Sequence, residues 1–228
     1  MKTTLGMVLL AAIAVVDANA QVVGDDACPL YGVDIAAFAT CDGDRVAGFN
    51  RGILTLALVT EAVVPISKRT ALGLYVDARG AHQLKHENPD RVVLIDVRSR
   101  MEVGVAGQAA SVDAHVPLLD TVLPLRWDDE LGGWAMERNP VFAQEVTQRL
   151  ARLGVDRNTP IVLLSRAGDR SARAADELAA LGYTKTISVV DGFEGDVGPD
   201  GRRSINGWKN AGLPWTARPL AALVYGAR

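Results

Sequence analysis

Short apolar runs alternate with amphipathic segments from residue 71 onward. In the run RVVLIDV, five apolar residues surround one Asp without any alternation of polar and apolar positions. This pattern is typical of a strand buried on both faces of a sheet. Shorter runs of similar character precede and follow it. The predicted strands are 73–76, 91–97, 160–164 and 186–190.

The amphipathic segments carry the end signals of helices. Asp77 and Asn139 are the expected N-caps, and Pro140 falls in the first turn of the second helix. Gly154 and Gly182 follow the last apolar positions as stop signals. The predicted helices are 78–88, 139–154, 171–182 and a short one at 206–212. Strands that alternate with helices predict an α/β fold, a parallel sheet with helices on both faces.

The first twenty residues have the pattern of a secretory signal peptide. Lys2 precedes an apolar run at 5–16, and Ala18-Asn19-Ala20 supplies the small residues of a cleavage site. The run is short for a membrane span, which needs about 20 residues, and an uncleaved anchor is the alternative. We therefore expect residues 1–20 to be removed, leaving a periplasmic or secreted chain that begins at Gln21.

Residues 21–70 show no clean periodicity, and we expect an N-terminal extension packed on the main domain. They contain both cysteines of the chain, Cys28 and Cys41. In an oxidising compartment this pair favours a disulfide, worth roughly 3 kcal/mol for a loop of this size. A redox-active or sulfur-carrying pair is the alternative, although the sequence has neither CxxC spacing nor a basic residue beside either thiol.

Composition narrows the classes of function. The 228 residues are 49% hydrophobic, enough for one domain with a sizeable core. A formal charge of -3 without a basic cluster argues against a nucleic-acid partner. The apolar stretch 52–66 is broken by Glu61 and Pro65, so we expect no membrane span in the mature chain.

The segment SRAGDR, residues 165–170, joins a predicted strand to a predicted helix. In open α/β sheets, ligands bind beyond the carboxyl ends of the strands. Amides that wrap into a helix N-terminus converge on one point, where the helix dipole adds positive charge. Gly168 permits the turn and Arg170 adds a guanidinium. The pattern indicates an anion-binding loop, and an ordinary strand-to-helix turn with solvent-facing arginines fits it equally well.

Several ordered motifs resemble those of rhodanese-like domains. SRAGDRSARAA is similar to the family's active-site loop, commonly Cys-Arg-x-Gly-x-Arg, and the Ser/Ala-rich helix after it. VVLIDVRSRMEV resembles an earlier strand end with Asp96, Arg98 and Glu102 at the matching positions. ISVVDGFEGD and NGWKNAGLPW resemble the late strand end and the closing segment. The resemblance covers 71–216, leaves 217–228 as a C-terminal tail, and extends to an exported single-domain subgroup.

The resemblance implies a sulfurtransferase that carries sulfur from a donor such as thiosulfate as a cysteine persulfide. This chain has Ser165 where the family has that cysteine. A serine hydroxyl needs a general base to act as a nucleophile, and the G-x-S-x-G elbow is absent from the sequence. The loop 165–170 has six residues, one fewer than the loop of the related phosphatases, so the resemblance does not predict phosphatase activity. We therefore expect a protein without sulfur transfer, in which Ser165 replaces a nucleophile.

The same resemblance suggests what the site retains. We expect the anion-binding loop to persist, with Asp96 and Arg98 as structural supports and with no cofactor. Its partner would be a small anion such as thiosulfate or sulfate, or a periplasmic protein. An active transferase that carries sulfur on another thiol is the alternative. The residues expected in the anion-binding loop after Ser165 are Arg166, Ala167, Gly168, Asp169 and Arg170.

Three histidines offer a weaker signal. His82 and His86 have the i, i+4 spacing of a metal pair, but QLK between them lacks the metalloprotease Glu and no third ligand is evident. We expect no metal and a solvated helix face. His115 precedes Val116-Pro117, and a structural role is favoured.

Two further groups are interpreted as structural. Trp127 and Trp134, in RWDDELGGW, are expected to cover the sheet edge, the alternative being the mouth of the site. The acids of a Gly-rich stretch lack EF-hand spacing and predict a hydrated loop. They are Asp191, Glu194, Asp196 and Asp200.

Overall fold

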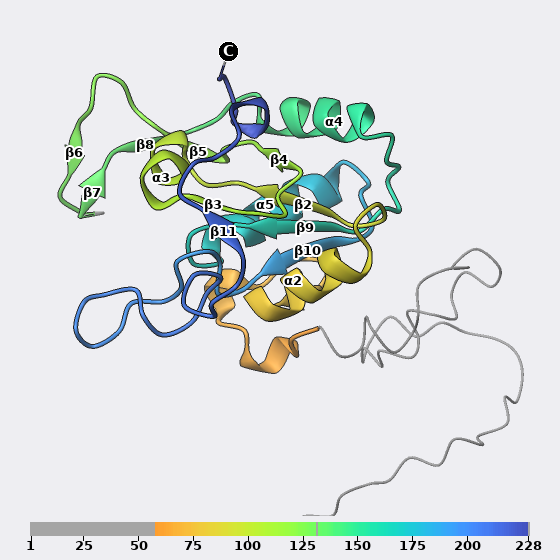
Figure 1. Cartoon of the computed structure of the whole chain (residues 1–228), viewed down its shortest axis with the longest axis horizontal. Coiled ribbons are helices and arrows are strands. Elements are labelled where there is room, and N and C mark those ends of the chain that lie inside the picture. Colours follow the sequence, from red (N-terminus) through yellow and green to blue (C-terminus); the bar gives the residue numbers. More distant parts are fainter. Residues whose placement is uncertain (1–57, 131, 228) are drawn as a thin grey trace, which may run out of the picture. The chain divides into compact units, whose positions relative to one another are not determined.

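A five-stranded parallel sheet forms the centre of the domain in the computed structural model, which describes residues 58–130 and 132–227. The strands run in the order β1-β10-β9-β2-β4, and each neighbouring pair is parallel (Figure 1). All four predicted apolar runs are strands of this sheet. The bounds are β1 Tyr75–Val76, β2 Val93–Asp96, β4 Ala114–His115, β9 Ile161–Leu164 and β10 Thr186–Val189.

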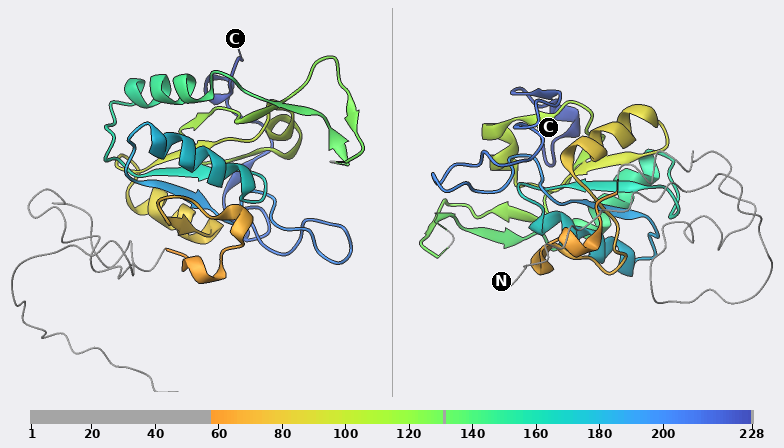
Figure 2. Two further views of the ribbon diagram at one scale, coloured as in Figure 1. Left: turned by 180° about the vertical axis from the view of Figure 1, so that it is seen from behind. Right: turned by 90° about the horizontal axis from the view of Figure 1, so that it is seen from below.

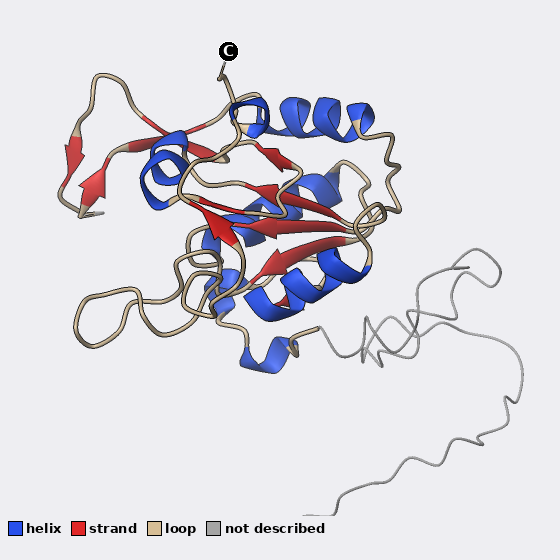
Figure 3. Cartoon of the chain, viewed as in Figure 1, coloured by secondary structure: helices blue, strands red, loops and turns tan. Residues whose placement is uncertain are grey.

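Helices cover both faces of the sheet, as predicted (Figures 2 and 3). Alternate residues of a strand point to opposite faces, so Leu94 packs in one core and Ile95 in the other. The first core includes residues of α2, and the second includes residues of α4 and α5. The helices are α2 Ala78–Glu87, α3 Arg100–Ala106, α4 Phe142–Arg152 and α5 Asp169–Ala180.

Helix ends follow the predicted signals in part. The Asp77 side chain accepts a hydrogen bond from the Gly80 amide, as expected of an N-cap. Asn139 is not an N-cap, because α4 begins at Phe142. Its side chain instead accepts from the Val141 amide and donates to the Pro117 carbonyl, which shapes the turn before the helix.

The helix predicted at 206–212 was wrong, since this segment forms turns. Gly207 and Gly212 have φ angles of 96° and 70°, outside the helical region. The Trp208 amide donates to the Gly192 carbonyl instead of to a helical neighbour. Trp208 is fully buried in the first core, so long-range packing determines the conformation of this segment.

Segments at both ends of the described chain pack on the domain. Leu58 forms an antiparallel bridge with Val76 of edge strand β1, and two 3₁₀ turns follow, Glu61–Val63 and Ile66–Lys68. Near the other end, Tyr225 packs against the second core. This end also contributes β11 Trp215–Thr216, antiparallel to β3 Gln108–Ala109, and the 3₁₀ turn Ala221–Leu223. The predicted signal peptide, Cys28 and Cys41 lie outside the described residues.

Residues 119–138 form an arm that leaves the sheet and returns to it (Figure 1). The expectation that Trp127 and Trp134 cover the sheet edge was wrong, because they pair with each other on a separate two-stranded ribbon. The strands of the arm are β5 Leu119–Thr121 with β8 Met136–Arg138, and β6 Trp127–Asp128 with β7 Gly133–Trp134. No helix in the described parts of the chain has the length and hydrophobicity to cross a membrane.

The sequence predicted that the four acids after β10 lie in a hydrated loop, and this prediction was wrong for Asp191. Asp191 is buried and accepts hydrogen bonds from the Ala78 amide at 2.8 Å and the Gly207 amide at 2.9 Å. It therefore joins the strand end to helix α2 and to the closing segment. Burial raises the pKa of Asp191 to about 6, opposed by the two amide hydrogen bonds and assisted by the charge of Asp77.

The raised pKa of Asp191 predicts a pH-dependent stability. The folded protein holds this proton more tightly than the unfolded chain, so the contribution to stability is full below pH 3.8 and is lost as the pH rises through about 6. Asp191→Asn should therefore differ from wild type by an amount that changes by up to about 3 kcal/mol across this window. Urea unfolding at several pH values measures it, with Asp200→Asn at an exposed site as control. Parallel pH curves for wild type and Asp191→Asn would contradict the assignment.

Candidate functional site

The loop 165–170 lies at the carboxyl edge of the central sheet, where the sequence placed it. It connects β9 to α5, and the register Asp96↔Leu164 puts the end of β2 beside the end of β9. Two glycines allow the loop to approach the chain after β10. A Cβ on Gly168 would lie 2.1 Å from the Val190 carbonyl oxygen, and one on Gly192 would lie 2.5 Å from the Ser165 carbonyl oxygen. Both positions require glycine because no side chain fits there.

Ser165 is fully buried and its hydroxyl is engaged with neighbours. The Gly168 amide donates to Ser165 Oγ at 3.0 Å, and Ser165 Oγ donates to Ser171 Oγ at 3.3 Å. Ser171 is also bonded to Ser188 Oγ at 3.0 Å and to the Gly168 carbonyl at 2.8 Å. Within the described residues, no titratable side chain forms a hydrogen bond with Ser165. The described hydrogen-bond partners of Ser165 are thus a backbone amide and a hydroxyl, and neither is a general base.

The start of helix α5 presents amide groups. Gly168 stands at its N-cap with φ 103° and provides no capping side chain. The first amides of a helix have no intrahelical acceptor, and the helix dipole concentrates positive charge near them. Asp169, in the first turn, is exposed to solvent, and Ala167 is half-buried. The amides and the helix dipole favour an anion near the loop, and the Asp169 carboxylate opposes one.

Arg170 is bound to a carboxylate and adds little free positive charge. Its guanidinium donates to both carboxylate oxygens of Glu102, at 2.6 and 2.5 Å, and is largely buried. Glu102 belongs to α3, where it forms a capping box with Ser99. Burial alone would raise the pKa of Glu102, but the hydrogen bonds and charge of Arg170 outweigh it and lower the pKa to about 2. Arg170 therefore joins α5 to α3 through an ion pair with Glu102.

Asp96 and Arg98 form a fully buried ion pair at the end of β2. The Arg98 Nη2 atom donates to Asp96 at 2.6 Å and to the Gly107 carbonyl at 2.8 Å. The guanidinium carbon lies 3.9 Å from the centre of the Phe193 ring. These contacts join β2, the end of α3 and the segment after β10. The pair therefore has the contacts expected of a structural support.

His115 also has structural contacts. Its Nε2 atom lies 2.7 Å from the Arg98 carbonyl, and its Nδ1 atom accepts from the Tyr225 amide at 3.1 Å. Burial lowers the pKa of His115, against the raising effects of Asp96 and the Arg98 carbonyl. A neutral ring with a proton on Nε2 satisfies both contacts. The histidine thus connects the support pair to the C-terminal segment.

Arg166 and Arg203 add positive charge near the loop, and nearby carboxylates, Glu102 among them, offset part of it. Arg166 keeps 41% of its side chain exposed and lies 3.6 Å from Glu102. Arg203 Nη1 donates to the Gly195 carbonyl at 2.6 Å, and the Gly195 amide donates to the Arg166 carbonyl. Burial and then the charge of Arg166 lower the pKa of Arg203. Sequence analysis missed Arg203, because nothing in GRRSI distinguishes it from Arg202.

His82 and His86 lie side by side on α2. The rings of His82 and His86 stack at 5.8 Å, and the edge of His82 meets Trp208. In the described chain, no group of three or more His, Cys, Asp or Glu side chains is placed to hold a metal ion. The expectation that this pair binds no metal stays a prediction. The expected solvated face was wrong for His82, which is half-buried against Trp208, whereas His86 is exposed.

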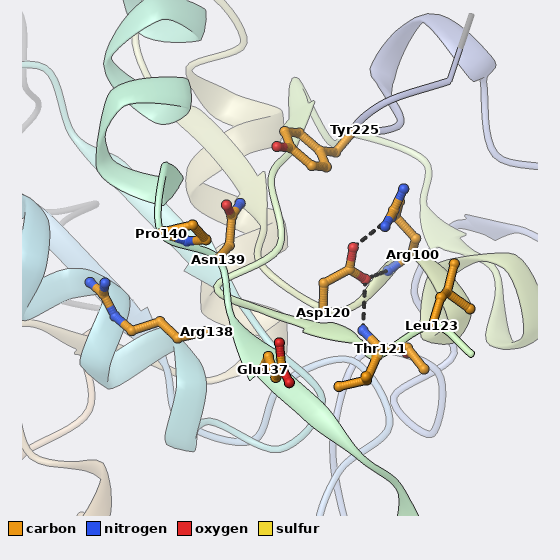
Figure 4. A pocket seen from close by; sticks show the side chains of 10 residues that line it. Arg100, Asp120, Thr121, Leu123, Glu137, Arg138, Asn139, Pro140 and Tyr225 are labelled. Carbon is orange, nitrogen blue, oxygen red and sulfur yellow. Dashed lines mark hydrogen bonds and ion pairs between the residues drawn. The ribbon is translucent and has the colours of Figure 1, made fainter. Parts of the chain in front are cut away.

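A cavity of about 330 Å³ lies away from this loop, between the arm and the C-terminal segment. Arg100, Asp120 and Tyr225 are among its lining residues (Figure 4). The Asp120 carboxylate accepts from the backbone and side chain of Arg100 and from the Thr121 amide. These contacts engage the Asp120 carboxylate with neighbouring residues of the cavity wall. Ser165 and Arg166 do not line it.

Comparisons with known proteins agree with this geometry. The Rickettsia conorii protein RC0915, whose function is uncharacterised, is 30% identical over 129 residues, 55% of this chain and 84% of that protein. The uncharacterised Rickettsia prowazekii protein RP600 is 40% identical over 58 residues, and this match spans only 42% of its length and 25% of this chain. The crystal structure of Rv0390 from M. tuberculosis is 28% identical, with a TM-score of 0.50, and the match covers 63% of this chain and 97% of that one.

The family profile described as Rhodanese-like domain matches residues 80–195, about half of the chain. This range includes the buried pair at the end of β2, the loop 165–170 and Asp191. The fold, with its parallel sheet and the loop at the carboxyl edge, accords with the match. The chain belongs to the rhodanese-like domain family.

Proposed function

We propose that this rhodanese-like domain binds a small oxyanion at the loop 165–170 and does not turn over sulfur. The observation that carries the proposal is the state of Ser165, whose buried hydroxyl is bonded to the Gly168 amide and to Ser171. A thiolate at this position would be an intrinsic nucleophile. A hydroxyl needs a base within hydrogen-bond reach, and the described residues place none there.

Charge and amide groups support an anion as the ligand. The start of α5 supplies amides and the dipole, while Arg166 and Arg203 supply guanidinium groups near the same loop. Glu102 neutralises most of the charge of Arg170, so an anion would meet a moderately positive site. Sulfate and thiosulfate are small, doubly charged and rich in acceptor atoms. They are the ligands that this combination fits.

Substitution of Ser165 tests the proposal. Wild-type protein should show no thiosulfate:cyanide sulfur transfer above background, and Ser165→Ala should leave that background unchanged. Ser165→Cys should restore measurable transfer, because the Gly168 amide and the start of α5 lower the pKa of a thiol placed there. Mass spectrometry should detect a persulfide at position 165 of this variant.

Other outcomes of this assay would refute the proposal. Wild-type turnover abolished by Ser165→Ala would make the serine catalytic. Wild-type turnover that survives Ser165→Ala but disappears in Cys28→Ser or Cys41→Ser would establish the alternative, an active transferase with another thiol carrier. A folded Ser165→Cys protein that never forms a persulfide would show that the loop no longer binds a donor.

Arg203 should contribute to donor binding. In the Ser165→Cys background, Arg203→Gln should raise the KM for thiosulfate by about 2- to 10-fold, since a cation near a partly exposed anion is worth roughly 1 kcal/mol. Arg202→Gln removes the same charge from an exposed neighbour and is the matched control. Equal KM values for these two variants would exclude Arg203 from the site. Steady-state kinetics at fixed ionic strength measure the difference.

We also propose that the protein is exported to the cell envelope and carries a Cys28–Cys41 disulfide. The support lies in the sequence, in the apolar run after Lys2, the Ala18-Asn19-Ala20 pattern and the isolated cysteine pair. Protein from a secreting host should begin at Gln21, and its intact mass should lack both thiol hydrogens. A mass that retains Met1 would refute export, and two alkylatable thiols in the mature protein would refute the disulfide.

A further inference from the structure

The arm 119–138 carries an apolar surface away from the cores of the domain. Both views of Figure 2 and the view of Figure 1 show it projecting from the body of the domain near the loop-bearing edge of the sheet. Four large apolar side chains on it are exposed to solvent, and patches of this kind on a soluble domain commonly mark binding surfaces. They are Leu123, Leu125, Trp127 and Trp134, with exposures of 72%, 46%, 54% and 43%.

Strand pairing places the two tryptophans on one side of the ribbon. Trp127 and Trp134 are cross-strand partners, and their rings meet edge to face with centroids 5.5 Å apart and an interplanar angle of 85°. Leu123 and Leu125 lie in the segment that leads into β6 and are exposed as well. A two-stranded ribbon has no second layer beneath it. The paired indoles are therefore presented to solvent as a preformed contact surface.

The charge of the ribbon indicates the chemistry of what it meets. Residues 126–134 contain three acids, Asp128, Asp129 and Glu130, against Arg126 alone, a formal charge of -2. Asp129 and Glu130 are exposed at the turn beside the tryptophans. Two copies meeting through a two-fold axis would oppose these acids to each other. An anionic lipid surface would repel them as well.

We propose that the arm is the docking surface for a second protein, which receives Trp127 and Trp134 in an apolar groove bordered by Lys or Arg. Buried indoles are frequent energetic centres of protein interfaces, and the acids beside them complement a basic rim. The base of the arm is held near the candidate site, because Arg170 Nη1 lies 3.9 Å from the sulfur of Met136 in β8, and Arg138 of β8 binds Glu177 further along α5. The proposal does not depend on anion binding at the loop 165–170.

Site-specific cross-linking in the source organism tests the proposal. A photoreactive phenylalanine analogue at Leu125 of the full chain should cross-link to one protein, while the same analogue at Ile66, which is 84% exposed elsewhere, should not. The cross-linked peptide of that protein should contain apolar residues flanked by Lys or Arg. Trp127→Ser with Trp134→Ser should abolish the cross-link, and so should Asp129→Lys with Glu130→Lys.

Once the cross-linked protein has been identified and purified, its Kd is measured for the wild-type chain and for each variant. Either double variant should weaken the Kd at least tenfold, and Asp200→Asn should leave it unchanged. Melting temperatures must match wild type, which is expected because the altered side chains are exposed. Cross-links only to a second copy of the chain, only to lipid, or equally from positions 125 and 66 would each overturn the proposal. A normal Kd for the tryptophan variant would overturn it too.

Discussion

The buried ion pair of Asp96 and Arg98 is the interaction on which the candidate site depends. Arg98 reaches the end of α3 through the Gly107 carbonyl and supports Phe193 with its guanidinium face. A buried pair is costly to desolvate and adds little net stability, but removing one partner leaves an uncompensated charge worth about 3 to 5 kcal/mol. Its contribution here is to hold neighbouring elements in position. It fixes the ends of β2 and α3, and the chain after β10 rests on it.

Glu102 sets the electrostatics of the loop from outside the loop. Within α3 it completes the capping box with Ser99, and across the site it binds Arg170 and approaches Arg166. The loop motif contains two arginines at a helix N-terminus. If the motif is considered without Glu102, the positive charge of the site is overestimated. The carboxylate leaves one of them neutralised and the other partly exposed, so the field at the loop is weaker than the motif suggests.

The local pattern of apolar and polar residues was sufficient to predict the framework of the fold and the position of the candidate site. Continuous apolar runs gave β1, β2, β9 and β10, because these strands are buried on both faces. Short elements such as β4 and α3 were missed, although Ser99-x-x-Glu102 is a helix-start signal that points to α3. The error at 206–212 arose because the burial of Trp208 and two positive-φ glycines override helical spacing.

Side-chain partners across the chain were beyond sequence reasoning. Arg170 and Glu102 are 68 residues apart, and no local pattern assigns one to the other. Arg203 is brought to the loop by two hydrogen bonds that pass through Gly195. Asp191 looked like one of several acids in a Gly-rich stretch, yet only this one is buried between two amides. Tertiary contacts, and not residue type, separate these residues from their neighbours.

Serine at position 165 suits the hydrogen bonding of its surroundings. A hydroxyl is both a strong donor and a strong acceptor, whereas a thiol is weak in both roles. Ser165 uses both capacities, toward Ser171 and from the Gly168 amide, and Ser188 extends the chain of buried hydroxyls. The loop therefore keeps its shape with no ligand needed to satisfy the Gly168 amide. An ordered loop at a helix N-terminus, with a hydroxyl where the family has a thiol, supports our proposal of anion binding over sulfur transfer.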